Sequence, residues 1–386
     1  MQPVIICHAE HKKSGSYSVL SDIFTNTKPK IYFDSQSEKA KIISELRTAP
    51  KLVVAWQADW WAFLAKALGH HVVIFPMWDS ARERPDVYYR AMEGVKSVCF
   101  CRRLFTLHCA LGLDARYAQF APDSTCLPIA RGWQNPPSVF HWQRIQDELD
   151  RSGAIQLLQN WPIGQIHVRP GECLGKPSDH PRTEYLQELS KHQIYLAPRR
   201  FEGIGLSFLE AMTMGLCVVA EDQPTHNEYI MFGVNGFLFR GDRDSLWPLP
   251  SVSVAHLERV GKKARESMVS IRRNWLLQIP KLRRWFEYQE PNRSSAKLST
   301  QDLLQLEECT ALFTSNPEAL YEWVAKKMKT PERSARSASG AARQQRKNRA
   351  GTFSSFWKRP RAFFLHYLVS RRGLTKGAFL GDDGSN

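Results

Sequence analysis

The sequence predicts an α/β fold built from two doubly wound parallel sheets. Three stretches alternate short apolar runs with helical patterns: PVIICHAEHKKSGSYSVLSDIF, KLVVAWQADWWAFLAKALGHHVVIFPMWD and VKSVCFCRRLFTLHCALGLD. Strands that alternate with helices form parallel sheets with helices on both faces. The alternation breaks between Pro122 and Pro137, which predicts a hinge between two domains, and then resumes through QIYLAPR, GLCVVAED and NGFLF. From Val252 to Phe286, apolar residues spaced three and four apart predict a helix.

Length and composition exclude several classes of protein. With 386 residues and 43% hydrophobic content, the chain is long enough for two globular domains. It contains no run of about 18 apolar residues, and its N-terminus is charged too early for a signal peptide, so we expect a cytoplasmic protein. The eight cysteines include no C-x-x-C pair, and several lie in apolar runs. Reduced, buried thiols are therefore favoured over disulfides or a zinc site, and no metal is expected.

The last 56 residues carry much of the net charge of +15. Residues 331–386 contain twelve Lys and Arg but three acidic residues. Their first part is too poor in apolar residues to fold alone, whereas FSSFWKRPRAFFLHYLVSRR combines aromatic, aliphatic and basic residues. This pattern is typical of a segment that lies on an anionic membrane surface, and a disordered basic terminus is the alternative. Nucleic-acid binding ranks below both, because Leu365, Leu368 and Val369 favour lipid over bases.

The segment APRRFEGIGLSFLEAM contains the main candidate site. It lies between two predicted strands, so we expect a loop followed by a helix, with Ser207 as the N-cap and Glu210 completing an S-x-x-E capping box. Backbone N–H groups of residues 203–206 would then face a phosphate at the helix entrance. Arg199 and Arg200 add positive charge for a diphosphate. Alternatively, the glycines serve only the turn and Glu210 only caps the helix.

Residues 202–239, EGIGLSFLEAMTMGLCVVAEDQPTHNEYIMFGVNGFLF, resemble the donor-binding signature of glycosyltransferase family 4. The matching positions are Glu202, Gly203, Gly205, residues 209–212, Gly215, Glu228, Gly233, Asn235 and Gly236. The resemblance implies a GT-B fold, in which two Rossmann-like domains face a central cleft. It also implies a retaining, metal-independent hexosyltransferase with no cofactor, which uses a nucleotide-sugar, most simply a UDP- or GDP-sugar, as co-substrate.

The resemblance also implies a role for individual residues. Glu210 is expected to hold the ribose hydroxyls and Glu202 the donor sugar, while Gly203, Ile204, Gly205 and Leu206 bind the diphosphate. Arg144 occupies the place of the family's arginine, but the lysine that normally follows is absent. Arg199, Arg200 or Arg182 could substitute for that lysine.

Other candidates lie in the first half or follow the next strand. Gly15 and Ser16 resemble the short glycine loop that lets a nucleotide or acceptor approach the first strand, and Asp79 is an acceptor-side candidate or a surface aspartate. His226 is a candidate for the nucleotide pocket, or caps its helix. His8 is expected to be a core histidine, and core packing is preferred for Trp56, Trp60 and Trp61.

These expectations divide the chain into four parts. Residues 1–130 form the acceptor-side domain, 131–290 the nucleotide-sugar domain, 291–330 a helical extension and 331–386 the basic, partly disordered tail. The predicted acceptor is a glycan or a lipid-linked sugar in surface polysaccharide biosynthesis, with peripheral contact to the inner face of the cell membrane. A catalytically inactive GT-B-like binding protein is the main alternative. A dinucleotide enzyme is disfavoured because no G-x-G-x-x-G follows the first strand.

Overall fold

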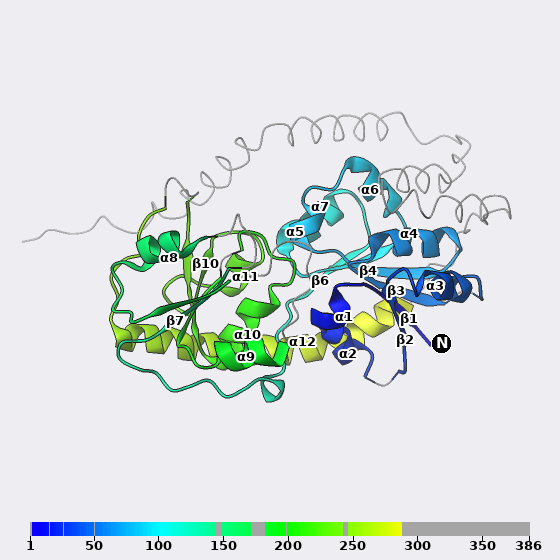
Figure 1. The fold of residues 1–386 in the computed structure, drawn as a ribbon. Coiled ribbons are helices and arrows are strands. Elements are labelled where there is room, and N and C mark those ends of the chain that lie inside the picture. The colour runs from blue at the N-terminus through cyan, green and yellow to red at the C-terminus, as the bar shows by residue number, and fades with distance from the viewer. Residues whose placement is uncertain are drawn as a thin grey trace, which may run out of the picture. The chain divides into compact units, whose positions relative to one another are not determined.

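The computed structural model describes residues 2–14, 16–25, 27–49, 51–143, 149–170, 182–197, 199–241 and 246–287. The chain divides into two units, Met1–Met328 and Lys329–Asn386, and all described residues belong to the first. That unit contains two parallel sheets (Figure 1). The expected helical extension and the basic tail lie outside the described residues. Among the described helices, none is long and apolar enough to cross a membrane.

The first sheet has six parallel strands in the order β2-β1-β3-β4-β5-β6. Runs such as VIIC and VVAW are buried on both faces of this sheet, which is why they lack the polar alternation of a half-exposed strand. The strands are β1 Val4–His8, β2 Lys30–Asp34, β3 Leu52–Trp56, β4 His71–Phe75, β5 Lys96–Cys99 and β6 Ala115–Tyr117.

Short helices connect these strands and cover the sheet. They are α1 His11–Ser14, α2 Val19–Ile23, α3 Lys39–Leu46, α4 Asp59–Ala67, α5 Trp78–Ala81, α6 Asp86–Ala91 and α7 Arg102–Ala110, with single turns η1 Ser16–Ser18 and η2 Ser124–Cys126. Trp56 and Trp61 are fully buried, which confirms that they are core residues. Helix α4 ends just before Gly69, whose φ of 85° is left-handed.

The second sheet has five parallel strands in the order β11-β10-β9-β7-β8. The strands are β7 Val139–Gln143, β8 Ile166–Pro170, β9 Ile194–Leu196, β10 Cys217–Glu221 and β11 Phe237–Phe239. The helices that accompany them are α8 Arg151–Leu158, α9 Arg182–Leu189, α10 Leu206–Met214 and α11 His226–Tyr229. Strands of the first sheet thus end at Tyr117 and those of the second begin at Val139, whereas a domain boundary at residue 130 stays a prediction.

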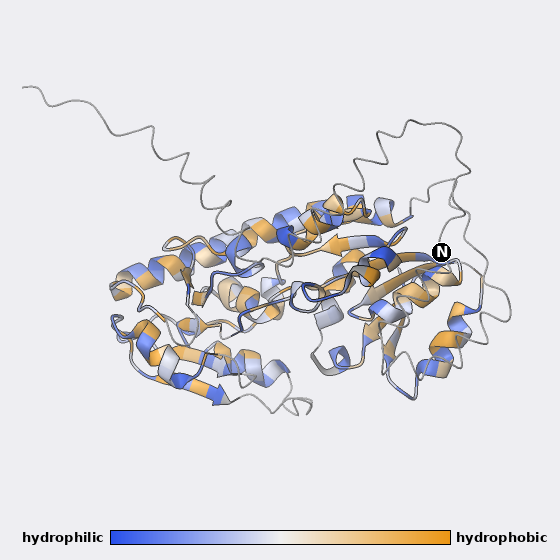
Figure 2. Ribbon diagram, turned by 90° about the horizontal axis from the view of Figure 1, so that it is seen from above, coloured by the Kyte–Doolittle hydropathy of each residue, from blue (hydrophilic) through white to orange (hydrophobic). Residues whose placement is uncertain are grey.

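The long helix α12, Val254–Glu287, links the two halves and confirms the helix predicted there. Figure 2 shows its alternating apolar and polar residues. Its apolar face packs against α10 and β10 and continues into the core of the first half through Trp275 and Phe286. Asp22 of α2 accepts hydrogen bonds from Arg272 Nη2 at 2.9 Å and Trp275 Nε1 at 2.8 Å. This helix therefore holds the two sheets as parts of one packed unit.

Candidate donor site

The loop that contains E-G-I-G joins the carboxyl end of β9 to α10, as expected. The helix begins at Leu206, however, and its N-cap is Gly205, with φ of 71° and no side-chain cap hydrogen bond. The expected N-cap role of Ser207 is therefore wrong. Glycine adopts the left-handed conformation without the strain of a Cβ atom, so the helix is capped at Gly205 and Ser207 is already its second residue.

Both glycines of the loop are required by packing. A Cβ atom at Gly205 would lie 1.9 Å from Cε1 and 2.6 Å from Cδ1 of Phe208, so it would overlap the edge of the ring. A Cβ atom at Gly203 would lie 2.8 Å from Cβ of Met77 and 3.1 Å from Oδ1 of Asp79. Gly203 thus packs directly against the first half of the molecule. The left-handed φ of Gly205 and the close packing at both glycines support the alternative that they shape the turn. Their contact with a diphosphate stays a prediction.

Arg199 contacts two of the carboxylates predicted for the site, Glu202 and Asp79. Its Nη1 lies 3.2 Å from Oε2 of Glu202, which is buried, and its Nη2 lies 3.4 Å from Oδ2 of Asp79 in the other half. Burial raises the pKa of Asp79, and the charge of Arg199 opposes that rise. The structure therefore brings Asp79 and Glu202 together around one guanidinium group at the contact between the two halves.

Two further arginines and one further carboxylate predicted for the donor site, Arg182, Arg200 and Glu210, are also paired. Glu210, in α10, is buried and accepts a hydrogen bond from Nη2 of Arg182, the first residue of α9. Nε of Arg200 lies 3.1 Å from Oε1 of Glu221, at the end of β10. The positive charges expected to meet a diphosphate thus already face carboxylates. A bound nucleotide would exchange these partners for phosphate and hydroxyl groups.

His226 is fully buried at the start of α11. Its Nδ1 donates to the carbonyl oxygen of Glu221 at 3.1 Å, and burial lowers its pKa to about 4, so the ring is neutral at pH 7. The neighbouring Thr225, which sequence analysis missed, donates through Oγ1 to the carbonyl oxygens of Glu202 at 2.9 Å and Gly203 at 3.2 Å. Thr225 has a positive φ of 79° and fixes the backbone of the E-G-I-G loop from the next strand connection.

In the first half, Ser16 belongs to a polar group that follows β1. Its Oγ lies 2.7 Å from Nδ1 of His11 and accepts a hydrogen bond from Nε1 of Trp56 at 3.2 Å. Burial lowers the pKa of His11, while the charge of Asp79 acts in the opposite direction. Sequence analysis missed His11. Its proximity to Asp79 connects the Ser16 group with the carboxylates around Arg199.

Of three further expectations, one is wrong and two concern residues outside the described part of the chain. His8 is exposed at the end of β1, so its assignment as a core histidine is wrong. His8 is the last residue of β1, and it is exposed whereas the four residues before it are buried. Gly15 and Arg144 lie outside the described residues, so their roles stay predictions.

Glu228, part of the signature segment, ties the second half to the first. Its carboxylate accepts from the backbone N–H of Arg102 and from the hydroxyl of Tyr117, both at 2.6 Å. Burial raises the pKa of Glu228, and these hydrogen bonds oppose the rise. Arg102 opens α7, so the carboxylate also lies where the helix dipole favours negative charge. In this structure Glu228 therefore links the second half to the first through hydrogen bonds.

A cavity of about 570 Å³ lies at the opposite end of the second sheet, where its strands begin. It is lined by residues 130–133, 192, 193 and 214–216 and by the start of α12. Arg131, Lys262 and Arg265 make its wall basic. This cavity is distinct from the E-G-I-G loop, which follows the carboxyl end of β9.

Comparisons with known proteins support the GT-B expectation. A sequence model described as glycosyl transferases group 1 matches residues 179–247. HepE from Anabaena, solved with UDP and glucose, is 14% identical with a TM-score of 0.51, and the match covers 73% of this chain and 100% of that one. Sucrose-phosphate synthase from Thermosynechococcus elongatus is 10% identical with a TM-score of 0.52, over 74% and 99% of the two chains. No curated protein sequence matches. The chain therefore has the GT-B fold, and residues 179–247, which contain its E-G-I-G loop, are similar to the glycosyl transferases of group 1.

Proposed function

We propose that this protein is a glycosyltransferase that moves a sugar from a nucleotide-sugar donor to an acceptor. One observation carries the proposal: the E-G-I-G loop and the N-terminus of α10 lie at the carboxyl end of β9, inside the segment that matches the glycosyl transferases group 1 model. Open parallel sheets bind ligands beyond the carboxyl ends of their strands. The N–H groups at a helix N-terminus favour an anion such as a diphosphate.

Each paired residue has a proposed role when the donor is bound. Glu210 accepts hydrogen bonds from the ribose hydroxyls, and Glu202 accepts from hydroxyls of the sugar. Arg199 and Arg200, with the backbone of residues 203–206, face the diphosphate. The buried His226 packs against Phe208, 5.0 Å between ring centroids, and supports the nucleotide pocket from behind. Arg144 is proposed as an additional phosphate contact.

The proposed chemistry is retaining and needs no metal ion. The bond between the anomeric carbon and the diphosphate oxygen breaks, and the bond to the acceptor oxygen forms on the same face of the sugar. The acceptor proton passes to the departing diphosphate. Positive charge around the leaving group stabilises the developing negative charge, which is the main catalytic contribution of such a site. Asp79 would orient acceptor hydroxyls from the other half.

The donor base and the acceptor are finer proposals. HepE, a structural neighbour, was solved with UDP and glucose, which makes a UDP-sugar the first donor to test. A glycan or lipid-linked sugar in polysaccharide biosynthesis is the proposed acceptor, with the basic residues 331–386 on an anionic membrane. Deletion of residues 331–386 should abolish binding to vesicles that contain anionic lipid. Unchanged binding would exclude the tail as the membrane contact.

The donor proposal is tested with a panel of UDP-, GDP-, dTDP- and ADP-sugars. Thermal shift identifies the donor, because a ligand that binds only the folded state raises its stability. Glu210→Ala should remove the shift, whereas Glu266→Gln, an exposed residue of α12, should keep it. Mass spectrometry of the released sugar, or of a glycosylated acceptor, then measures transfer. A chain that no donor stabilises, or Glu210→Ala with an unchanged shift, would contradict the proposal.

The arginine–carboxylate pairs favour one second candidate, a GT-B protein that binds a nucleotide or glycan without transfer. Arg182, Arg199 and Arg200 each face a carboxylate that a donor must displace. Tight nucleotide binding without hydrolysis or transfer, across acceptors and with the full chain, would favour this candidate. Turnover that depends on Arg199 would exclude it.

A further inference from the structure

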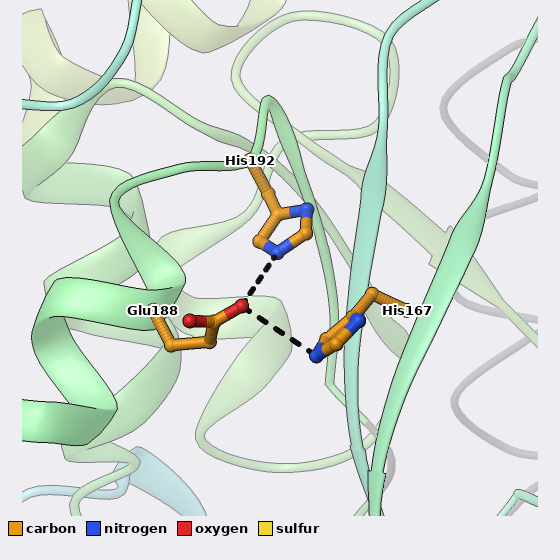
Figure 3. Close-up of side chains that lie close together, drawn as sticks. All are labelled: His167, Glu188 and His192. Carbon is orange, nitrogen blue, oxygen red and sulfur yellow. Dashed lines mark ion pairs between the residues drawn. The ribbon is translucent and has the colours of Figure 1, made fainter.

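Two histidines and one glutamate converge at the edge of the second sheet, away from the proposed donor site (Figure 3). His167 lies on β8, Glu188 on α9, and His192 in the connection between α9 and β9. Nε2 of His167 lies 3.5 Å from Oε1 of Glu188, and Nε2 of His192 lies 3.6 Å from the same oxygen. The ligand atoms of all three residues lie within 4.8 Å of one another. We call these residues the His–Glu cluster.

The His–Glu cluster lies where the strands begin. His167 is the second residue of β8, and His192 precedes β9 by two residues. The E-G-I-G loop, in contrast, follows the last residue of β9. Any ligand of the cluster is therefore separate from a donor bound at the carboxyl ends.

His192 presents a buried nitrogen to Glu188. Only 10% of its side chain is exposed, and its Nε2 has no hydrogen-bond partner among the described residues. Its other nitrogen, Nδ1, lies 3.0 Å from Oγ of Ser138, which fixes the plane of the ring. A hydrogen bond on the second nitrogen is the arrangement that orients histidine ligands of metal ions. A buried polar atom without a partner is costly, so a ligand at Nε2 would remove that cost.

The two carboxylate oxygens of Glu188 face different groups. Oε2 accepts a hydrogen bond from Nζ of Lys191 at 2.6 Å. Oε1 faces both histidines and is available to share one ion with them.

We propose that the His–Glu cluster binds a divalent transition-metal ion of the Zn²⁺ type through Nε2 of both histidines and Oε1 of Glu188. Ligands about 2.0–2.2 Å from a tetrahedral ion are about 3.3–3.6 Å apart, close to the two observed His-to-Glu distances of 3.5 and 3.6 Å. The two imidazole nitrogens would reach the same spacing if the side chain of His167 rotated. That side chain is free to do so because it is 43% exposed on an edge strand. Water supplies the fourth ligand. Imidazole and carboxylate favour Zn²⁺ over Ca²⁺ or Mg²⁺, which take oxygen ligands.

The ion would act as a structural link. It would connect the edge strand β8 to the carboxyl end of α9 and to the segment that leads into β9. Sequence analysis disfavoured a zinc site because the cysteines lack the spacing for one, and this cluster uses no cysteine. The expectation that sugar transfer needs no metal ion is compatible with this proposal, because the cluster and the proposed donor site lie at opposite ends of the strands.

The experiment uses the full chain, stripped with a chelator and desalted, and titrated with Zn²⁺ in a calorimeter. We expect one ion to bind and to raise the melting temperature. His167→Ala and Glu188→Gln should each weaken that binding by at least about 10- to 100-fold and abolish the thermal shift. Both side chains are partly exposed, so the metal-free variants should melt close to the metal-free wild type. His256→Ala, which removes an imidazole outside the cluster, should bind like wild type.

Two results would overturn the proposal. One is wild-type protein that binds no Zn²⁺ and shows no thermal shift. The other is binding that His167→Ala and Glu188→Gln leave unchanged, which would place the ion elsewhere, for example at the exposed thiols of Cys109 and Cys126.

Discussion

At the carboxyl end of the second sheet, arginines face carboxylates, whereas at the end where the strands begin, imidazoles face a carboxylate. The first arrangement includes Arg199 with Glu202 and Arg182 with Glu210. Guanidinium groups stay charged at all relevant pH values and match phosphate geometry. Imidazole nitrogens instead are common ligands of transition-metal ions. The same sheet thus presents two sets of side chains, one suited to an anion and the other to a cation.

Helix α9 belongs to both ends. Arg182, its first residue, pairs with Glu210 of the proposed donor site, and Glu188, near its last residue, belongs to the His–Glu cluster. The helix is only eight residues long, so a shift in packing at one end would also move the residues at the other end. Variants that affect one end alone therefore test whether the two sites are independent.

The largest expected effect is on the fold of the donor loop. Gly205→Ala forces a Cβ atom into a left-handed residue and into the ring of Phe208, so we expect a loss of about 2–4 kcal/mol in the free energy of unfolding. Gly233→Ala is the matched control, because its φ is also 71° but nothing lies within 4 Å of the added Cβ. Urea unfolding of both variants isolates the cost of the ring contact. Equal losses would show that Phe208 adds no constraint.

The second effect is on turnover. Arg199→Ala removes the charge between Asp79 and Glu202 and the proposed compensation for the leaving diphosphate, so we expect kcat to fall by about 100-fold. Arg259→Ala, an exposed residue of α12, is the control for loss of an arginine. Initial rates with the donor selected by the panel measure the effect. Wild-type turnover in Arg199→Ala would remove this residue from the mechanism.

The third effect is a dependence of stability on pH. Because burial raises the pKa of Asp79 in the folded state, the ionised carboxylate costs stability above its ordinary pKa of 3.8. Asp79→Asn should therefore be more stable than wild type at pH 7. The advantage should disappear as the pH falls below about 3.8, where the carboxyl is protonated in both states. A less stable variant at pH 7 would mean that the ion pair with Arg199 outweighs burial.

The smallest effect concerns Lys191, whose ion pair with Glu188 is largely exposed. Lys191→Ala should cost no more than about 0.5 kcal/mol in the free energy of unfolding. It should leave Zn²⁺ affinity unchanged or raise it, because Lys191 binds the carboxylate oxygen that faces away from the histidines. A loss of Zn²⁺ binding in calorimetry would show that Lys191 instead holds Glu188 in the ligating position.

The sequence predicted strands such as those of QIYLAPR and GLCVVAED, the long helix α12 and the donor loop, because each depends on neighbouring residues, but it did not identify β2 or β8. Hydrophobic spacing specifies α12, and the E-G-I-G segment is contiguous in the chain. The N-cap was wrong because the capping preference of Ser207 is a weaker local constraint than the left-handed conformation available to Gly205. His8 was misassigned because a strand pattern does not show where the strand leaves the packed layer.

The residues that the sequence did not indicate are connected only through the fold. Thr225 supports the donor loop from 22 or more residues further along the chain, and His11 approaches Asp79 from a different strand connection. The His–Glu cluster combines residues from a strand, a helix and a loop. No fixed spacing in the sequence identifies such a set, because the order of the strands and the position of α9 in the fold bring its members together.

The most direct measurement is calorimetric titration of Glu210→Gln and Glu188→Gln with the nucleoside diphosphate that the panel selects, beginning with UDP. Both variants replace a carboxylate by an amide of the same shape. Glu210 pairs with the first residue of α9, and Glu188 lies near the last residue of that helix. The account predicts that Glu210→Gln binds the nucleotide at least about 10-fold more weakly than wild type, while Glu188→Gln binds it normally. Equal nucleotide affinity in Glu210→Gln and wild type would contradict a donor site at the carboxyl end of the second sheet.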